Sequence, residues 1–218
     1  MQNMKIELKP TDKIAIFGQT GSGKSIMGKV LLVNYPKYFV FDPLGEYSAF
    51  GKTVYSLDEI DLEEDKKIIF NPIMTDNDEM THDACAKFVW ENMPNTLFYT
   101  DEMSNYQGAK LTSNFKKLLT QGRHRGNGMI SVTQRYALIN QTIITQSHHI
   151  FMFKMMGRDI ETSRGYFGKE IEDYFKKLKE YHSIYWGTRQ EKLEIMKPIP
   201  QETVSKIDRK DKTVGDPT

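Results

Sequence analysis

The sequence predicts an α/β fold built around a mainly parallel sheet. Short apolar runs typical of strands alternate along the chain with longer segments typical of helices. Between the first such run and the first such helix lies a glycine-rich segment, GQTGSGKS, at Gly18–Ser25. The alternation favours parallel strands joined by crossover helices. A chain of 218 residues is long enough for one large domain with appendages.

Five apolar runs are expected to form the principal strands: Ile14–Phe17, Tyr38–Asp42, Thr96–Thr100, Met129–Thr133 and His149–Lys154. Minor extended segments are predicted at Lys5–Leu8, Thr53–Ser56 and Lys67–Phe70. Near the C-terminus, a small closing hairpin is predicted from the strands His182–Gly187 and Lys192–Met196.

Helices are predicted at Lys24–Asn34, His82–Asn92, Ala109–Gln121 and Lys169–Glu180. The last has a one-sided apolar stripe, with the spacing i, i+3, i+4, i+7, at Ile171, Tyr174, Phe175 and Leu178. After Pro198 the chain is polar and has no periodic pattern. Residues 198–218 are therefore expected to form a flexible tail, or one that is ordered against a partner.

The composition limits the classes of protein to consider. The formal net charge is +1, which neither requires nor excludes a nucleic-acid partner. No window approaches the length of a membrane span, and the first residues lack a signal-peptide pattern. Cys85 is the only cysteine, which excludes an internal disulfide and suits a reducing compartment.

The segment GQTGSGKS has the pattern of a phosphate-binding loop in the required context, after a strand and at the start of a helix. Its glycines let the backbone amides turn toward phosphate oxygens, and the helix adds its positive dipole end. Lys24 would reach the β- and γ-phosphates, and Ser25 would offer its hydroxyl to Mg²⁺. The expected nucleotide-binding residues are Gly18, Gln19, Thr20, Gly21, Ser22, Gly23, Lys24, Ser25 and Ile26.

Two acids, Asp101 and Glu102, follow the buried strand Thr96–Thr100. In a phosphate site, Asp101 would hold the Mg²⁺ shell opposite Ser25. Glu102 would orient and deprotonate the water that attacks the γ-phosphate. The alternative is a surface acid pair that caps the next helix. The phosphate-binding loop upstream favours the catalytic interpretation.

Gln134 ends the strand Met129–Thr133, where an amide can touch the γ-phosphate or the attacking water; a plain polar residue leaving a strand is the alternative. Arg123 and Arg125 precede that strand. Cations there suit the negative end of a helix dipole, and Gly126 suits a helix C-cap. Equally, one arginine could be a finger inserted into a neighbouring subunit's site. The residues alone leave both readings open.

The assembled motifs resemble those of the FtsK/HerA superfamily of DNA-translocating ATPases. The resemblance runs from Ile14 to Lys154 and is carried by GQTGSGKS, by FVFDPLGEYS at Phe39–Ser48, by LFYTDEM at Leu97–Met103 and by RGNGMISVTQR at Arg125–Arg135. It implies a RecA-like P-loop NTPase fold over residues 1–197, with helices on both faces of a sheet of strand order 5-1-4-3-2. It also implies a homo-oligomeric ring, usually a hexamer, with the ATP site at the subunit junction. Arg125 would then be the first choice for the trans-acting arginine, with Arg123 and Arg135 as alternatives.

The chain is most similar to the genome-packaging ATPases of icosahedral viruses with an internal membrane, because it lacks the additional domains of larger members. The resemblance implies an ATP-hydrolysing translocase that packages double-stranded DNA into a capsid, with ATP and Mg²⁺ as cofactors. Its expected partners are double-stranded DNA, further copies of the chain and a capsid-vertex or membrane protein. It would act in the host cytoplasm or on the virion.

Three other functions stay open. One is a different DNA pump of the same superfamily, used in conjugation or phage extrusion. Another is a nucleotide kinase in which residues 123–125 form a phosphate lid, although a water-activating glutamate argues against phosphate transfer to another acceptor. The third is a nucleotide-dependent docking subunit that acts on protein. Glu46 and Tyr47, after the second strand, either approach the nucleotide or pore, or simply close their turn.

Overall fold

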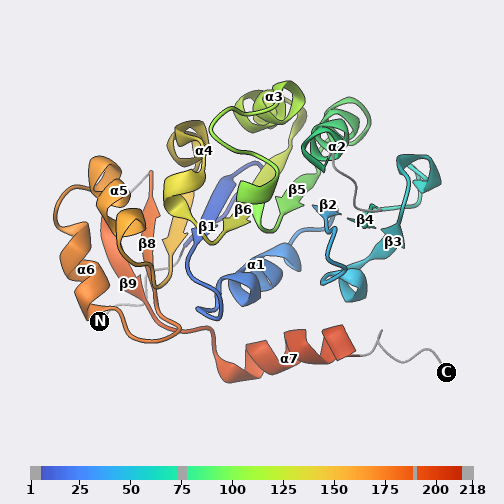
Figure 1. The fold of residues 1–218 in the computed structure, drawn as a ribbon. Helices are drawn as coiled ribbons and strands as arrows, with labels where there is room; N and C mark the ends of the chain where they lie inside the picture. The colour runs from blue at the N-terminus through green and yellow to red at the C-terminus, as the bar shows by residue number, and fades with distance from the viewer. Residues whose placement is uncertain (1–5, 73–77, 189–190, 213–218) are drawn as a thin grey trace.

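The computed structural model describes residues 6–72, 78–188 and 191–212 (Figure 1). The strands in this part of the chain are β1 (Lys13–Phe17), β2 (Tyr38–Phe41), β3 (Lys52–Val54), β4 (Lys67–Phe70), β5 (Leu97–Thr100), β6 (Gly128–Thr133), β7 (His149–Met152), β8 (Ser183–Gly187) and β9 (Leu193–Met196). The α-helices are α1 (Lys24–Leu32), α2 (Asp78–Asn92), α3 (Ser113–Gln121), α4 (Gln141–Gln146), α5 (Arg158–Phe167), α6 (Ile171–Lys177) and α7 (Gln201–Lys212).

All of these strands join one sheet, in the order β3-β4-β2-β5-β6-β1-β7-β8-β9. Its middle part, β2-β5-β6-β1-β7, is parallel and has the predicted order 5-1-4-3-2 when read from β7. The complete sheet is wider than that core. β4 and β3 extend it in parallel beyond β2, and the predicted hairpin, β8 and β9, continues it antiparallel beyond β7. The α/β class and the mainly parallel sheet are confirmed.

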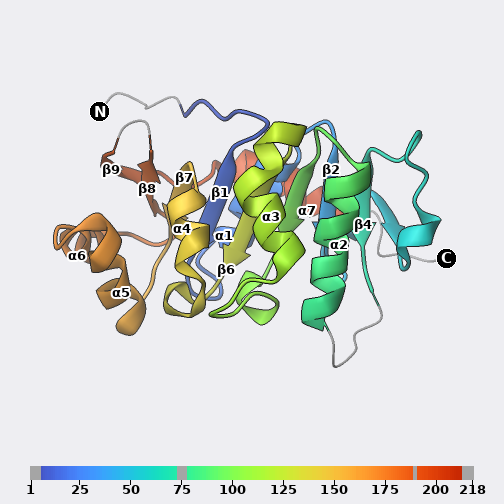
Figure 2. The same cartoon turned by 90° about the horizontal axis from the view of Figure 1, so that it is seen from above.

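Helices cover both faces of the sheet, which explains why its central strands are buried along their whole length. α2, α3 and α4 lie over one face, and α1 lies over the other with α7 beyond it (Figures 1 and 2). Because side chains alternate along a strand, β1 contributes Ala15 and Phe17 to the apolar core under α2–α4. Its intervening residues Ile14 and Ile16 pack in the core under α1. β1 is therefore fixed from both sides, directly before the phosphate-binding loop.

Several element boundaries differ from the predictions. The helix expected at Ala109–Gln121 begins only at Ser113, because Thr112 is extended. The helix expected at Lys169–Glu180 covers only Ile171–Lys177. Helices α4 and α5 were not predicted, because both are short and contain few apolar residues. Of the minor segment Lys5–Leu8, Lys5 lies outside the described residues and the remaining three form no strand.

The segment after Pro198 differs from the flexible tail that we expected. Residues 201–212 form α7, which packs against α1 and against the short 3-10 turn Ser48–Phe50. Ile207 is only 5% exposed and belongs to the same apolar core as Leu31 and Leu32 of α1. Val204 and Ile207 are three positions apart and share one face of α7. Two apolar residues are too few to form a recognisable helical pattern in the sequence.

His82 on α2 gives the fold a defined pH dependence. Its ring is fully buried and pairs with the Thr100 hydroxyl (2.9 Å) and the Gln107 amide (3.0 Å). Burial lowers its pKa from 6.5 to about 3, against a smaller opposing effect of Asp83. Below its ordinary pKa the unfolded chain binds a proton that the folded chain excludes. The stability contributed by neutral His82 is therefore complete above pH 6.5 and is lost as the pH falls toward 3.

We expect the free energy of unfolding to fall, through His82 alone, by up to about 1.4 kcal/mol per pH unit within this window. His82→Gln should remove that part of the slope, whatever it does to the absolute stability. Urea unfolding of both chains between pH 7 and pH 4 measures the two slopes. Equal slopes would contradict the account of His82 as a neutral buried group.

Candidate active site

The phosphate-binding loop joins β1 to α1 and is bonded to the neighbouring strand. The amide of Gln19 donates to the carbonyl of Lys154 (2.9 Å), and that of Phe153 donates to the carbonyl of Phe17 (2.7 Å). A Cβ at Gly18 would lie 2.6 Å from the Cβ of Phe153, so only glycine fits this close approach. Gly23, before α1, has a left-handed φ of 102°.

The loop fits a bound triphosphate. Lys24 is only 5% exposed, and it lines the cavity beside the loop. The Ser22 hydroxyl is buried and has no hydrogen-bond partner among the described residues. An orphaned donor of this kind in a glycine-rich turn is suited to an oxygen-rich ligand.

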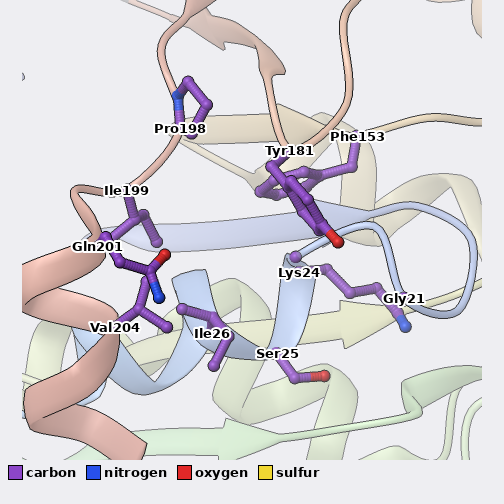
Figure 3. A pocket seen from close by; sticks show the side chains of 11 residues that line it. Gly21, Lys24, Ser25, Ile26, Phe153, Tyr181, Pro198, Ile199, Gln201 and Val204 are labelled. Carbon is purple, nitrogen blue, oxygen red and sulfur yellow. The ribbon is translucent and has the colours of Figure 1, made fainter.

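Two cavities flank the loop and share Gly21, Lys24 and Ser25. One, of about 450 Å³, is largely apolar and extends toward Tyr181 and the C-terminal segment (Figure 3). The other, of about 570 Å³, lies at the ends of β2, β5 and β6. Its acidic side chains are Asp42, Glu46, Asp101 and Glu102.

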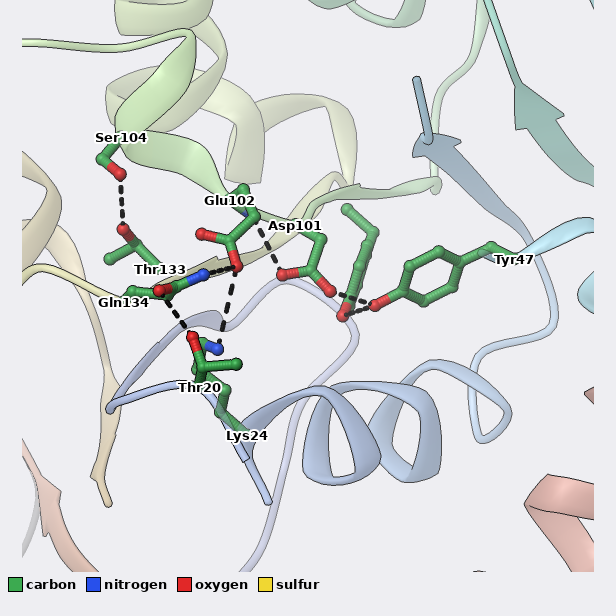
Figure 4. Close-up of polar contacts among 9 residues, drawn as sticks. Thr20, Lys24, Tyr47, Asp101, Glu102, Ser104, Thr133 and Gln134 are labelled. Atoms are coloured by element: carbon green, nitrogen blue, oxygen red, sulfur yellow. Dashed lines mark hydrogen bonds and ion pairs between the residues drawn. The ribbon is translucent and has the colours of Figure 1, made fainter. Parts of the chain in front are cut away.

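Lys24, at the start of α1, converges in the second cavity with Glu102 and Gln134, which follow β5 and β6 (Figure 4). Lys24 Nζ lies 3.7 Å from Glu102 Oε1, and Gln134 Nε2 donates to the same oxygen at 2.6 Å. The Thr20 hydroxyl donates to Gln134 Oε1 (2.8 Å). The parallel pairing of β1, β6 and β5 explains this, because their carboxyl ends meet at one edge of the sheet. The structure thus brings together Lys24, Glu102 and Gln134.

Glu102 has an unusual backbone conformation. Its φ of 48° and ψ of 43° are left-handed, a region that residues other than glycine rarely adopt. Its amide donates to Asp101 Oδ1 (2.9 Å), and the nearby Ser104 hydroxyl accepts a hydrogen bond from Thr133 (2.9 Å). Such conformations persist where the surrounding structure imposes them, and they are concentrated at functional sites. The turn after β5 therefore holds Glu102 toward Lys24 at some cost in backbone strain.

Asp101 is positioned by Tyr47, a residue to which the sequence alone gave no definite role. Tyr47 donates its hydroxyl hydrogen bond to Asp101 Oδ2 (2.5 Å), and its oxygen lies 2.6 Å from that of Tyr99. Burial raises the pKa of both phenols, so they stay neutral and able to donate. Within the DPLGEY turn, the Asp42 carboxylate accepts hydrogen bonds from the backbone amides of Glu46 (2.9 Å) and Tyr47 (2.8 Å). The turn is thus closed by Asp42, and Tyr47 connects it to Asp101.

The donor set also suits Mg²⁺. Among the described residues, no three His, Cys, Asp or Glu side chains lie close enough to hold a metal ion by themselves. Mg²⁺ in nucleotide sites needs no such cluster, because one or two protein oxygens combine with phosphate oxygens and water. Ser25 and Asp101 line the same cavity and supply an oxygen of this kind each.

Arg123 and Arg125 lie at the amino ends of the parallel strands, whereas the phosphate-binding loop lies at their carboxyl ends. Both precede β6, whose six residues span about 20 Å, whereas Gln134 follows it. Arg125 donates to the carbonyl of Glu91 (3.2 Å) and packs over the Trp90 ring, whereas Arg123 is exposed. Neither arginine reaches the site of its own chain. Arg135 does line the acidic cavity, but it is paired with Asp159 at 3.5 Å.

This combination of fold and site is that of a P-loop ATPase. The chain belongs to the family described as helicase HerA, central domain, whose model matches residues 2–184. The resemblance to the FtsK/HerA superfamily is thereby confirmed. None of the helices in the described part of the chain has the length and apolar character needed to cross a bilayer.

Its relatives include viral packaging proteins. The chain is 29% identical over 143 residues to the DNA packaging ATPase P9 of Enterobacteria phage PRD1, a match that covers 61% of this chain and 60% of P9. It resembles the genome packaging NTPase B204 of Sulfolobus turreted icosahedral virus 2 in complex with AMP, with a TM-score of 0.76 and 25% identity over 88% of this chain and 100% of that one. The same NTPase in complex with ATP-gammaS gives a TM-score of 0.74, again with 25% identity and the same two coverages.

Proposed function

We propose that this protein is an ATP-hydrolysing translocase that packages double-stranded DNA into a viral capsid. The observation that carries the hydrolytic part is the position of Glu102, 3.7 Å from the buried Lys24 and bonded to Gln134. The DNA and the capsid come from the relatives, since P9 is named a DNA packaging ATPase and B204 a genome packaging NTPase.

In the proposed mechanism, Lys24 turns from Glu102 to the β- and γ-phosphates when ATP binds. Glu102 is then released to accept a proton from the attacking water, while Gln134 holds both the carboxylate and Thr20 of the loop. Ser25 and Asp101, the latter fixed by Tyr47, would hold Mg²⁺, which neutralises charge that develops on the phosphates.

The motor would be a ring of identical subunits, a hexamer, with each ATP site completed by an arginine of the neighbour. Residues 1–197 would form the ATPase domain, and residues 198–218 would be an appendage to it. A capsid-vertex or membrane protein would dock the ring. The protein would act in the host cytoplasm or on the virion.

The test is the rate of phosphate release at increasing concentrations of double-stranded DNA, with the mass of the protein measured in parallel. We expect the protein to form a large ring whose ATPase rate increases with DNA concentration at low salt. At high salt DNA should no longer stimulate the rate, because contacts to DNA phosphates weaken as the salt concentration increases. An assembled ring whose rate ignores DNA would refute translocation. Phosphate transfer to a nucleotide acceptor by a monomer would instead indicate a kinase, and stimulation by capsid protein alone a docking subunit.

A further inference from the structure

A further cavity, of about 260 Å³, lies at the amino ends of the central strands. Lys13, which begins β1, lines it together with Arg123 and His148, which precede β6 and β7. The five residues of β1 separate Lys13 from the phosphate-binding loop by about 16 Å. This cavity is therefore distinct from the two that flank the loop, and the proposed mechanism does not use it.

Lys13 is a buried cation. The residue is 3% exposed, and its ammonium group has no ion pair or hydrogen bond within the described part of the chain. Burial lowers the pKa of Lys13, and the nearby Arg123 guanidinium lowers it further, against a smaller opposing effect of Asp12. A buried charge is costly unless it is paired. An anion in the cavity would therefore stabilise Lys13 and reduce its repulsion by Arg123.

The acidic residue next to Lys13 in the chain is engaged elsewhere. Asp12 accepts the backbone amide of Lys9 (2.7 Å) and lies 3.0 Å from His149 Nε2. Residues 103–158 form most of the cavity walls and contain eight lysines and arginines but no aspartate or glutamate. None of the described acidic residues lines the cavity. The cavity thus has a positive potential that its own walls do not neutralise.

His148 is fixed to β1 through its ring and its backbone. Its Nδ1 accepts the backbone amide of Lys13 (3.0 Å), and its own amide donates to the Lys13 carbonyl (2.8 Å). The neutral ring therefore carries its proton on Nε2, which is a donor, and the side chains of Lys13 and Arg123 are donors only. Lys13 is buried, His148 is half-buried and Arg123 is exposed, so the cavity opens to solvent on the side of Arg123.

We propose that this cavity binds one phosphate group, held by Lys13, Arg123 and His148. Two permanent cations suit a doubly charged oxyanion, and charge-assisted hydrogen bonds to phosphate are among the strongest in proteins. Sites for drug-sized ligands usually enclose about 300–1,000 Å³, so this cavity fits a phosphate group with water rather than a nucleotide. The group can be free inorganic phosphate or a phosphate of a DNA backbone. The proposal does not depend on the proposed ATPase function.

Titration calorimetry with inorganic phosphate tests the site, in chains that all carry Lys24→Ala to weaken binding at the phosphate-binding loop. We expect Lys13→Met to weaken phosphate binding at least tenfold. Lys87→Met is the matched control, because Lys87 is an exposed lysine of α2 that lines none of the three cavities. The control should bind phosphate as the parent chain does. Equal affinities of Lys13→Met and the control, or no binding to the parent chain, would overturn the inference.

Two additions complete the experiment. If Lys13→Met does not fold, as judged by circular dichroism, His148→Gln replaces it and should also weaken phosphate binding. Arg123 is kept in every chain, because it is a candidate for the arginine that completes a neighbouring ATP site. Short double-stranded DNA that displaces the bound phosphate would identify a backbone phosphate as the ligand, and phosphate that stays bound would identify the free ion. Both results support the site, provided that Lys13→Met abolishes the binding.

Discussion

Replacing Glu102 by glutamine is expected to lower the rate of ATP hydrolysis by about 10²–10⁴-fold while ATP still binds. The amide is close in shape to the carboxylate and can still accept the hydrogen bond from Gln134, which now measures 2.6 Å. It cannot accept the proton of the attacking water. It also removes the negative charge 3.7 Å from Lys24, so the lysine is freer to bind phosphate.

Phosphate release under single-turnover conditions, together with the dissociation constant for ATP, measures the effect. Glu161→Gln is the matched control, since Glu161 is an exposed acid on α5 that lines neither cavity flanking the phosphate-binding loop. We expect the control to hydrolyse ATP as the wild type does. A Glu102→Gln variant that keeps the wild-type rate would show that another group activates the water.

Arg123→Ala is expected to lower the rate of the assembled ring by about 10³–10⁵-fold, the effect of losing an arginine finger. The resemblance to the superfamily pointed first to Arg125, but that side chain is held by the Glu91 carbonyl and the Trp90 ring of its own chain. Arg123 is exposed at the same edge of the sheet and is the freer of the two to enter a neighbouring site. We therefore expect Arg125→Ala to cost less activity.

Subunit mixing tests whether Arg123 acts across the interface. Rings of Arg123→Ala alone and of Lys24→Ala alone should both be inactive. Mixed rings should recover part of the activity, because some junctions combine an intact Lys24 in one subunit with an intact Arg123 in the next. Mixed rings without activity would contradict a role in trans, since an arginine acting within its own subunit cannot be complemented.

The sequence was sufficient to predict the centre of the fold. Glu102 and Gln134 follow apolar strands, and Lys24 stands in the loop after the first one, so all three could be assigned to the carboxyl ends of parallel strands before any geometry was known. The strand order, however, came from resemblance rather than from the residues themselves. Pairing of distant strands is a tertiary property that no local pattern specifies.

Contacts between distant segments could not be predicted. For Tyr47 the sequence left open an approach to the nucleotide or pore and a role in closing its turn, but nothing local to DPLGEY indicates that its hydroxyl meets Asp101, more than fifty positions along the chain. α7 was missed for a related reason. It has few apolar residues, and the stability that they give the helix depends on their packing against α1.

The most direct test of the central claim is a structure of the protein with a non-hydrolysable ATP analogue and Mg²⁺. We predict that Lys24 Nζ leaves Glu102 and contacts the terminal phosphate, with Glu102 and Gln134 facing that phosphate from the ends of β5 and β6. A terminal phosphate directed toward Tyr181, out of reach of Glu102, would contradict the account.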